Sequence, residues 1–307
     1  MVKQLANPRI AAPLAVIALI GIAAAAIMQD QTSRSILIRP SPPADHRISY
    51  GKDPLNFGEL RLPKGPGPHP VAVIIHGGCW LAEYDLSYMG HLAASLTEAG
   101  IATWNLEYRR IGNEGGGWPG TFQDVAQGTD YLRALAKTYP LDLNRVVALG
   151  HSAGGHLVLW LGARKKIAKG SPLFTDEPLV LRGIIGLAAI TDLRKSGTAC
   201  DASVEQLMGG VAKDLASIYD QVSPVELLPV GVKQAVIHGE RDNLVPSRMS
   251  GDYAEAAKNK GDAVKLLIIE AAGHFELVDP KSSAWSQVLD EVLDLLEMKR
   301  KHETNEK

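Results

Sequence analysis

The sequence predicts an α/β domain in which helices cover both faces of a mainly parallel β-sheet. Several short apolar runs lack the alternation of apolar and polar residues, which suits strands that are buried on both faces. These runs lie at residues 71–75, 102–106, 146–149, 184–187, 235–237 and 264–269. Segments with apolar residues at helical spacing separate most of them, at residues 85–99, 122–137, 153–164 and 285–298. Such a succession of strands and helices predicts a parallel sheet with two helical layers.

The first predicted elements form a hairpin. Residues 46–50 and 57–62, separated by Lys52-Asp53-Pro54, predict an antiparallel pair that leads into the parallel strands. Gly100 ends the first predicted helix, and Thr121-Phe122-Gln123-Asp124 has the pattern of a capping box that opens the second. A single domain over residues 46–298 therefore accounts for most of the chain.

Composition and charge exclude several classes of protein. The chain has 307 residues, with 32 lysines and arginines against 34 aspartates and glutamates and a formal net charge of −2. It therefore has no general basic surface for a polyanion, and nucleic acid is not an expected partner. Its two cysteines exclude a disulfide-rich scaffold and a cysteine-rich zinc site. No histidine pair has the spacing of an H-E-x-x-H motif, so we expect neither a metal nor another cofactor.

The N-terminus has the pattern of an export signal or a membrane anchor. Lys3 and Arg9 precede an uncharged run at residues 10–28, and a basic region followed by an apolar core is typical of both. The small residues at 24–26 offer a cleavage site, whereas the length of the run also suits an uncleaved anchor or, as a third alternative, a buried helix. Because acidic residues follow the run, we expect the rest of the chain to be exported, periplasmic or secreted. The predicted divisions are a signal peptide or anchor at residues 1–29, a proline-containing linker at 30–45 and a charged tail at 299–307.

The strongest chemical signal is the segment Gly150-His151-Ser152-Ala153-Gly154, which has the pattern G-x-S-x-G. An apolar strand leads directly into it and an apolar helix leads out of it. This context predicts a nucleophile elbow, a sharp turn whose strain exposes the serine hydroxyl above the sheet. Ser152 is therefore the predicted nucleophile, and a glycine-rich turn with an incidental serine is the alternative.

A serine nucleophile needs a general base and a carboxylate that orients this base. Where an elbow carries the serine, the order along the chain is serine, acid, histidine. Asp242 lies in a polar loop after the strand at 235–237, and His274 follows the strand at 264–269. We predict Asp242 as the acid and His274 as the base. Glu240 as the acid and His238 as the histidine remain alternatives.

The reaction also needs N–H donors for the negative charge that develops on the substrate carbonyl. His76-Gly77-Gly78-Cys79-Trp80 follows the strand at 71–75 and supplies backbone N–H groups on a glycine-containing loop. We expect the N–H of Gly78 or Cys79, with Gly77 shaping the turn, to join that of Ala153 in an oxyanion hole.

The other side chains of this loop are expected to have structural roles. His76 is expected to hold the loop in place, and Cys79 to line the pocket rather than act as a nucleophile. Because the loop must keep its donors fixed, we predict that Cys79 and Cys200 stay unbridged.

Residues 192–230 are predicted to form a small helical cap over the strand ends that carry the site. Short helices are expected within it at residues 203–208 and 213–219. Trp80 and Trp118 are the expected substrate-binding aromatic residues. Trp118 follows a glycine-rich stretch at residues 115–117 that we expect to be a mobile active-site loop.

These motifs, in this order, resemble the α/β-hydrolase superfamily, and within it the HGGxW group of small esterases, kynurenine-formamidase-like proteins and prolyl-oligopeptidase-like hydrolase domains. The resemblance covers residues 50–296 and rests on HGGCW at 76–80, EYRR at 107–110, GHSAGGH at 150–156, GERDNLVP at 239–246 and AAGHF at 271–275. The resemblance implies a triad formed by Ser152, Asp242 and His274. It also implies an oxyanion hole formed by Gly77, Gly78 and Ala153. The stretch EYRRIG departs from the YRLAP-like stretch of hormone-sensitive-lipase-type esterases and from the formamidases, so no substrate carries over.

We therefore expect a serine hydrolase that cleaves carboxylic esters of small molecules through an acyl-enzyme intermediate and without a cofactor. An arylformamidase or a small peptidase would use the same residues. From another class, a binding protein that keeps the fold without catalysis is the alternative.

Overall fold

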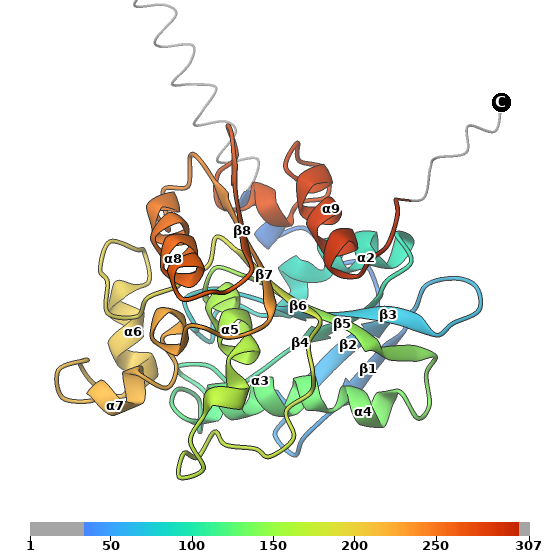
Figure 1. Cartoon of the computed structure of the whole chain (residues 1–307). Coiled ribbons are helices and arrows are strands. Elements are labelled where there is room, and N and C mark those ends of the chain that lie inside the picture. The colour runs from blue at the N-terminus through green and yellow to red at the C-terminus, as the bar shows by residue number, and fades with distance from the viewer. Residues whose placement is uncertain (1–33, 301–307) are drawn as a thin grey trace, which may run out of the picture.

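The structure, a computed structural model, describes residues 34–300, which form one eight-stranded β-sheet between layers of helices (Figure 1). The strand order is β1-β2-β4-β3-β5-β6-β7-β8. The predicted α/β architecture, a mainly parallel sheet that is covered on both faces, is confirmed.

Every predicted strand is present, although β5 and β7 extend beyond the predicted residues 146–149 and 235–237. The strands are β1 (His46–Ser49), β2 (Phe57–Arg61), β3 (His69–Ile75), β4 (Ala102–Leu106), β5 (Leu141–His151), β6 (Gly183–Leu187), β7 (Lys233–Gly239) and β8 (Val264–Ile269). β1 pairs antiparallel with β2, and β2 with β4, so the predicted hairpin is present, and the remaining pairs are parallel. Every residue of β3, β4 and β6 is buried, as expected for strands covered on both faces.

Helices pack on both faces of the sheet. One face carries α2 (Gly90–Glu98), which follows the 3-10 helix η2 (Leu86–Met89), and α9 (Trp285–Leu295). The other carries α3 (Gly120–Asp130), α4 (Leu132–Leu135), α5 (Ala153–Gly162) and α8 (Ser247–Asn259). Successive residues of β3 point to opposite faces, so Val73 joins the core under α5 and Ile74 joins the core under α2. The sheet therefore separates two apolar layers.

Two helices differ from the sequence-based expectation. The sequence pattern does not predict α8, because its buried stripe consists of Met249, Tyr253 and Ala257 among charged neighbours. The predicted capping box is wrong, since α3 begins at Gly120 and the Thr121 hydroxyl donates to the carbonyl oxygen of Arg109 at 2.6 Å. Thr121 thus ties the chain after β4 to α3 and caps no helix.

The described N-terminal residues are docked on the domain. Residues Ser35–Leu37 form the 3-10 helix η1, in which Ile36 is fully buried. The Arg39 guanidinium makes two hydrogen bonds to the Asp279 carboxylate, at 3.0 and 2.8 Å. From Arg34 onward the chain therefore differs from the linker predicted for residues 30–45, because a buried isoleucine and an ion pair hold it in place.

The predicted signal peptide or anchor at residues 1–29 lies outside the described residues, and so does most of the predicted tail, residues 301–307. Between residues 34 and 300, no helix combines the length and the apolar character needed to cross a bilayer. Export of the chain stays a prediction.

The segment between β6 and β7 carries the predicted cap helices, observed as α6 (Asp201–Met208) and α7 (Ala216–Tyr219). Two side chains of α5 fasten this segment to the body of the domain. His156 Nε2 lies 3.0 Å from the carbonyl oxygen of Val222, and the Trp160 indole N–H donates to the carbonyl oxygen of Gln221 at 3.1 Å. The cap is therefore anchored on the helix that follows the elbow.

Candidate active site

Ser152 lies in a sharp turn between β5 and α5. β5 ends at His151 and α5 begins at Ala153, so a single residue connects strand and helix. The Ser152 backbone has φ 56° and ψ −120°, which is strained for a residue with a side chain. Its N–H donates to the carbonyl oxygen of Leu187 in β6 at 2.8 Å, which holds the turn over the sheet. This is the geometry of a nucleophile elbow.

Two glycines near Ser152 allow close backbone contacts. A Cβ atom on Gly154 would lie 2.2 Å from the carbonyl oxygen of Ile75, and one on Gly77 would lie 2.5 Å from the carbonyl oxygen of His151. A larger residue at either position would require the backbone to move. These contacts bring the ends of β3 and β5 together and place the loop after β3 beside Ser152.

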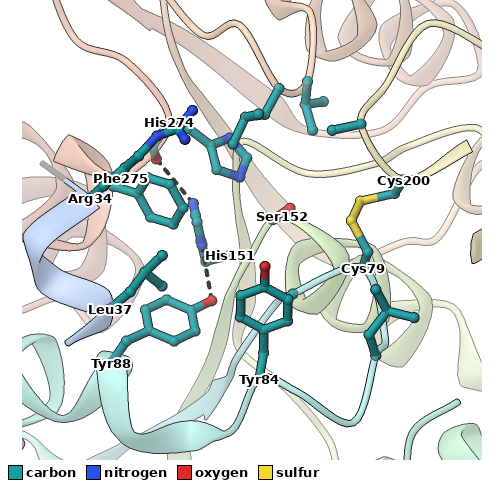
Figure 2. Close-up of a pocket in the computed structure, with 15 residues that line it drawn as sticks. Arg34, Leu37, Cys79, Tyr84, Tyr88, His151, Ser152, Cys200, His274 and Phe275 are labelled. Atoms are coloured by element: carbon teal, nitrogen blue, oxygen red, sulfur yellow. Dashed lines mark hydrogen bonds between the residues drawn. A yellow bond between two sulfur atoms is a disulfide. The ribbon is translucent and has the colours of Figure 1, made fainter. Parts of the chain in front are cut away.

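His274 and Asp242 meet in the loops that follow β8 and β7. Nδ1 of His274 lies 2.6 Å from Oδ2 of Asp242. The other carboxylate oxygen accepts from the backbone N–H groups of Leu244 and Val245, each at 2.9 Å. The His274 ring and the Ser152 hydroxyl face the same pocket (Figure 2). The structure thus brings together the serine, the acid and the histidine that the sequence singles out.

A second histidine contacts the same carboxylate. His238 is fully buried, and its Nε2 lies 3.2 Å from Oδ2 of Asp242 and 2.8 Å from the carbonyl oxygen of Val245. Its Nδ1 lies 2.7 Å from the Ser250 hydroxyl. Burial would raise the pKa of Asp242, but hydrogen bonds from His238 and His274 outweigh burial and hold the pKa well below its usual range. The carboxylate is therefore charged when it contacts His274.

The two alternatives from the sequence occupy other places. Glu240 is exposed, and its carboxylate accepts from the backbone N–H of Ala271 at 3.3 Å. Both ring nitrogens of His238 are engaged, and His238 does not line the pocket that holds Ser152. The geometry therefore favours Asp242 over Glu240 and His274 over His238.

The loop after β3 presents backbone N–H groups beside Ser152. Among residues 34–300, the N–H groups of Gly78, Cys79 and Ala153 have no hydrogen-bond partner. The N–H of Gly77 instead donates to the Tyr88 hydroxyl at 2.6 Å. Gly77 thus shapes the loop, and the N–H groups of the other three residues are the candidate oxyanion donors.

His76 fixes the start of this loop. Its Nδ1 lies 2.9 Å from the carbonyl oxygen of Gly77, and its Nε2 lies 3.0 Å from Oε1 of Glu107. Arg110 contacts the same glutamate oxygen at 2.7 Å, and the Tyr108 hydroxyl donates to the carbonyl oxygen of His76 at 2.7 Å. Because these side chains are buried, the EYRR stretch forms part of the support under the loop.

A chain of hydrogen bonds that the sequence does not reveal links the loop after β3 to His274. Nε2 of His151 lies 3.0 Å from the carbonyl oxygen of His274, which only accepts, so Nε2 carries a proton. Burial and the nearby His274 hold the pKa of His151 well below its usual value, so the ring is neutral and Nδ1 accepts from the Tyr88 hydroxyl at 3.0 Å (Figure 2). Tyr88 in turn accepts from Gly77, which completes the connection.

Tyr88→Phe is expected to lower kcat/KM for esters by about 10- to 100-fold, because small displacements of catalytic groups are costly. The substitution leaves the Gly77 N–H and Nδ1 of His151 without their partner and so loosens both loops. Steady-state kinetics checks this, with Tyr139→Phe, a tyrosine outside the pocket lining, as the control. Wild-type activity in Tyr88→Phe would contradict the positioning role.

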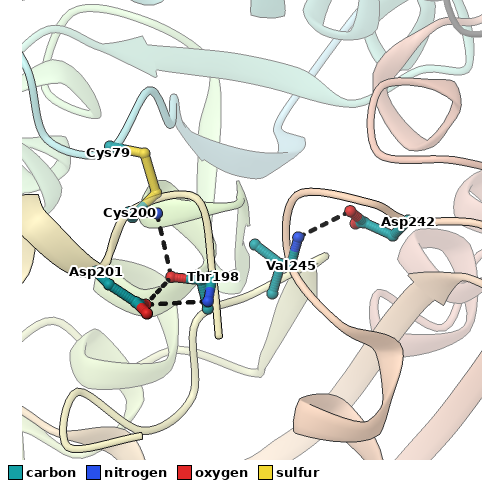
Figure 3. The surroundings of a disulfide bond; sticks show 6 residues. All are labelled: Cys79, Thr198, Cys200, Asp201, Asp242 and Val245. Atoms are coloured by element: carbon teal, nitrogen blue, oxygen red, sulfur yellow. Dashed lines mark hydrogen bonds between the residues drawn. A yellow bond between two sulfur atoms is a disulfide. The ribbon is translucent and has the colours of Figure 1, made fainter. Parts of the chain in front are cut away.

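The two cysteines form a disulfide, so the prediction that they stay unbridged is wrong. Cys79 in the loop after β3 is bonded to Cys200 at the start of the cap, with Cα atoms 5.1 Å apart (Figure 3). Beside the bridge, the N–H of Ala199 donates to the carbonyl oxygen of Leu244, in the loop after β7, at 2.8 Å. The bridge ties the loop after β3 to the cap.

The cap side of the disulfide is ordered by its own hydrogen bonds. The Asp201 carboxylate accepts from the Thr198 hydroxyl at 2.6 Å and from the Thr198 N–H at 3.0 Å (Figure 3). The N–H of Cys200 donates to the same hydroxyl at 3.1 Å. The disulfide therefore joins two hydrogen-bonded loops at one side of the pocket.

Replacing both cysteines, by Cys79→Ser with Cys200→Ser, is expected to lower the free energy of unfolding by about 2–4 kcal/mol. It should also lower kcat/KM by about tenfold, because the oxyanion donors lose their tether to the cap. Urea unfolding and steady-state kinetics measure the two effects. Alkylation of the wild-type protein without reductant, followed by intact-mass measurement, provides the control. Two alkylated thiols there would show that the bridge is absent.

Ser152 and His274 line a pocket of about 300 Å³. Most of its other side chains are apolar, and they include Leu37, Leu81, Tyr84, Leu244, Val245 and Phe275. Such a lining suits an uncharged, apolar portion of a substrate. In the part of the chain that the structure describes, no group of three or more His, Cys, Asp and Glu side chains is arranged to hold a metal ion.

Neither tryptophan that was expected to bind substrate lines this pocket. Trp80 is fully buried, with its ring edge against His156. The N–H of Trp118 donates to the carbonyl oxygen of Leu207 in α6 at 2.7 Å, and its ring packs on Phe122. Trp80 therefore packs against α5, and Trp118 connects the chain before α3 to the cap.

Comparisons with known proteins identify a family and several similar proteins. Residues 59–256 match the BD-FAE family. The protein described as "Probable isoprenylcysteine alpha-carbonyl methylesterase ICME" of Oryza sativa subsp. japonica is 23% identical over 263 residues, which cover 81% of this chain and 63% of that protein. "Esterase LipC" of Mycobacterium tuberculosis is 24% identical, with 76% and 60% covered. The chain thus spans about three fifths of the length of these two relatives.

A solved structure has the same fold. It is a truncated form of a carbohydrate esterase from gut microbiota that is 20% identical to this chain. The TM-score is 0.71, and the match covers 84% of this chain and 98% of that one.

Proposed function

The chain belongs to the BD-FAE family and has the α/β-hydrolase fold, and from this premise we propose that it is a serine hydrolase that cleaves carboxylic esters. The similarity to relatives named as esterases supports the proposal. The observation that carries the proposal is the 2.6 Å contact between Nδ1 of His274 and Oδ2 of Asp242. His274 lines the same pocket as Ser152, which lies in the strained elbow. A base, an acid that orients it and a nucleophile that faces the substrate pocket are the parts that acyl transfer needs.

In the acylation step, Oγ of Ser152 attacks the ester carbonyl carbon while Nε2 of His274 takes the hydroxyl proton. The charged Asp242 holds Nδ1–H and stabilises the imidazolium that forms. The carbonyl oxygen becomes negative and is stabilised by the N–H groups of Gly78, Cys79 and Ala153. The bond between the carbonyl carbon and the alcohol oxygen then breaks, and the imidazolium gives its proton to that oxygen. The acyl group remains on Ser152.

Deacylation follows the same route with water in place of the alcohol. Water attacks the acyl carbon while His274 removes a proton from it. The bond between the acyl carbon and Oγ of Ser152 then breaks, and His274 gives the proton to Oγ as the carboxylic acid product leaves. Every proton transfer uses a side chain of this chain, so the proposed cycle requires no metal or other cofactor.

A panel of substrates tests the proposed function. The purified protein is given p-nitrophenyl esters, N-formyl anilides and dipeptide anilides, and release of the chromogenic group is followed. We expect turnover of the esters, with kcat/KM far above that for the anilides. Preferential turnover of the formyl anilides or dipeptide anilides would favour an arylformamidase or a small peptidase. No turnover of any class would favour a non-catalytic binding protein.

We further propose that the domain acts outside the cytoplasm, because basic residues precede the apolar run at residues 10–28 and acidic residues follow it. A phosphatase that requires export for activity, fused after Pro43, reports the orientation. Phosphatase activity in intact cells is the expected result. An inactive fusion, together with activity of a reporter that works only in the cytoplasm, would contradict export.

A further inference from the structure

The N-terminal segment formed by residues 34–39 is held on the domain at two points. Ile36 is fully buried and belongs to the core cluster beneath α2 and α9. The Arg39 guanidinium pairs with both oxygens of Asp279, at 3.0 and 2.8 Å. Burial would raise the pKa of Asp279, but the hydrogen bond from Arg39 outweighs it and lowers the pKa, so the carboxylate is charged in this pair. Asp279 follows His274 closely along the chain, so the segment is fastened next to the loop of the proposed base.

This segment also reaches the active-site pocket. Leu37 lines the pocket that contains Ser152, and it packs against the same core cluster as Ile36. Figure 2 shows Leu37, Tyr88 and Phe275 on one side of Ser152 and the Cys79–Cys200 disulfide on the other. A segment that precedes the first strand therefore supplies part of one apolar wall of the site.

The chemistry of the proposed reaction indicates which part of an ester meets this wall. His274 must give its proton to the alcohol oxygen, so the alcohol leaves on the side of the imidazole ring. Phe275 packs edge-on against that ring, with centroids 5.1 Å apart, and lines the same wall as Leu37. The alcohol portion of the substrate would therefore extend toward Leu37.

We propose that residues 34–39 hold Leu37 in the wall of the site and that Leu37 limits the length of the alcohol group of the ester. The inference rests on the proposed ester hydrolase function. A side chain that ends an apolar pocket discriminates between substrates by the methylene groups it admits or excludes.

The test compares two series of esters with the full chain. In one series, acetates of ethanol, butanol and octanol vary the alcohol, and in the other, ethyl esters of acetic, butyric and octanoic acid vary the acyl group. Leu37→Ala should raise the octyl-to-ethyl ratio of kcat/KM in the alcohol series by about tenfold, and Leu37→Trp should lower it by about the same factor. The corresponding ratio in the acyl series should change by less than about twofold, because Leu37 does not face that group.

Ile38→Ala is the matched control, because Ile38 is the neighbour of Leu37 and is 86% exposed. It should leave both ratios as in the wild type. Arg39→Ala, which removes the pair with Asp279, should shift the alcohol ratio in the direction of Leu37→Ala, and Arg39→Lys should restore most of the wild-type ratio. Near-ultraviolet circular dichroism verifies that each variant is folded.

Three results would overturn the inference, and each has a distinct meaning. Unchanged alcohol ratios in folded Leu37→Ala, with normal ester turnover, would show that Leu37 does not limit the substrate while the proposed function stands. A change confined to the acyl series would show that the wall meets the acyl group. No turnover of either series by the wild-type protein would reject the proposed function itself, and this inference with it.

Discussion

Ser152→Ala is expected to lower kcat/KM for esters by roughly four to six orders of magnitude while the fold persists. The substitution removes the oxygen that attacks the substrate and leaves the elbow otherwise intact. The hydrogen bond that holds the turn comes from the backbone N–H of Ser152 to Leu187, at 2.8 Å, and alanine keeps it. Steady-state kinetics measures the loss, and thermal unfolding verifies the fold.

Ser217→Ala is the control for this variant, because Ser217 is exposed in α7 and does not line the pocket. It should retain wild-type activity. Turnover above about 1% of the wild-type value in Ser152→Ala would contradict the assignment of the nucleophile, since nucleophile removal in such enzymes costs far more.

Asp242→Asn is expected to lower kcat by about three to four orders of magnitude. The amide has nearly the shape of the carboxylate but lacks the charge that stabilises the imidazolium of His274. It also disturbs the contact to His238, because the carboxylate oxygen at 2.6 Å from His274 lies 3.2 Å from Nε2 of His238. The neighbouring carboxylate provides the comparison, since Glu240→Gln should change kcat by less than about threefold.

The two variants together decide which carboxylate serves the base. Each variant loses one negative charge relative to the wild type, and both positions lie in the loop after β7. A loss of activity that is caused by the lost charge alone would therefore appear in both variants. A larger loss in Glu240→Gln than in Asp242→Asn would show that Glu240 is the acid.

The sheet and most of its helices could be predicted because their apolar periodicity is local in the sequence. β4 and β8 begin and end at the predicted residues. Apolar periodicity does not predict an element whose packing depends on few apolar residues or on weakly apolar ones. α8 buries a methionine, a tyrosine and alanines, and the docking of residues 34–39 depends on Ile36 and on an ion pair formed across 240 residues. No local pattern distinguishes such a segment from a linker.

The candidate triad could be predicted because each member follows a strand of the parallel sheet, and the ends of parallel strands meet at one edge of the sheet. The contacts that support the triad could not be predicted from the sequence. Tyr88, His151 and His238 make hydrogen bonds to residues that are distant in the sequence. The direction of these hydrogen bonds also depends on which ring nitrogen of each histidine carries the proton. The disulfide depends on how the cap folds back, and this path is set by contacts such as that between Ala199 and Leu244.

Labelling with a fluorophosphonate is the most direct test of the central claim, that Ser152 is an activated nucleophile. The probe phosphonylates only serines whose hydroxyl is activated by a base. The wild-type protein should gain one probe, and peptide mapping should place it on Ser152, whereas Ser152→Ala should gain none. A probe on another residue, or no labelling of the folded wild-type protein, would contradict the account.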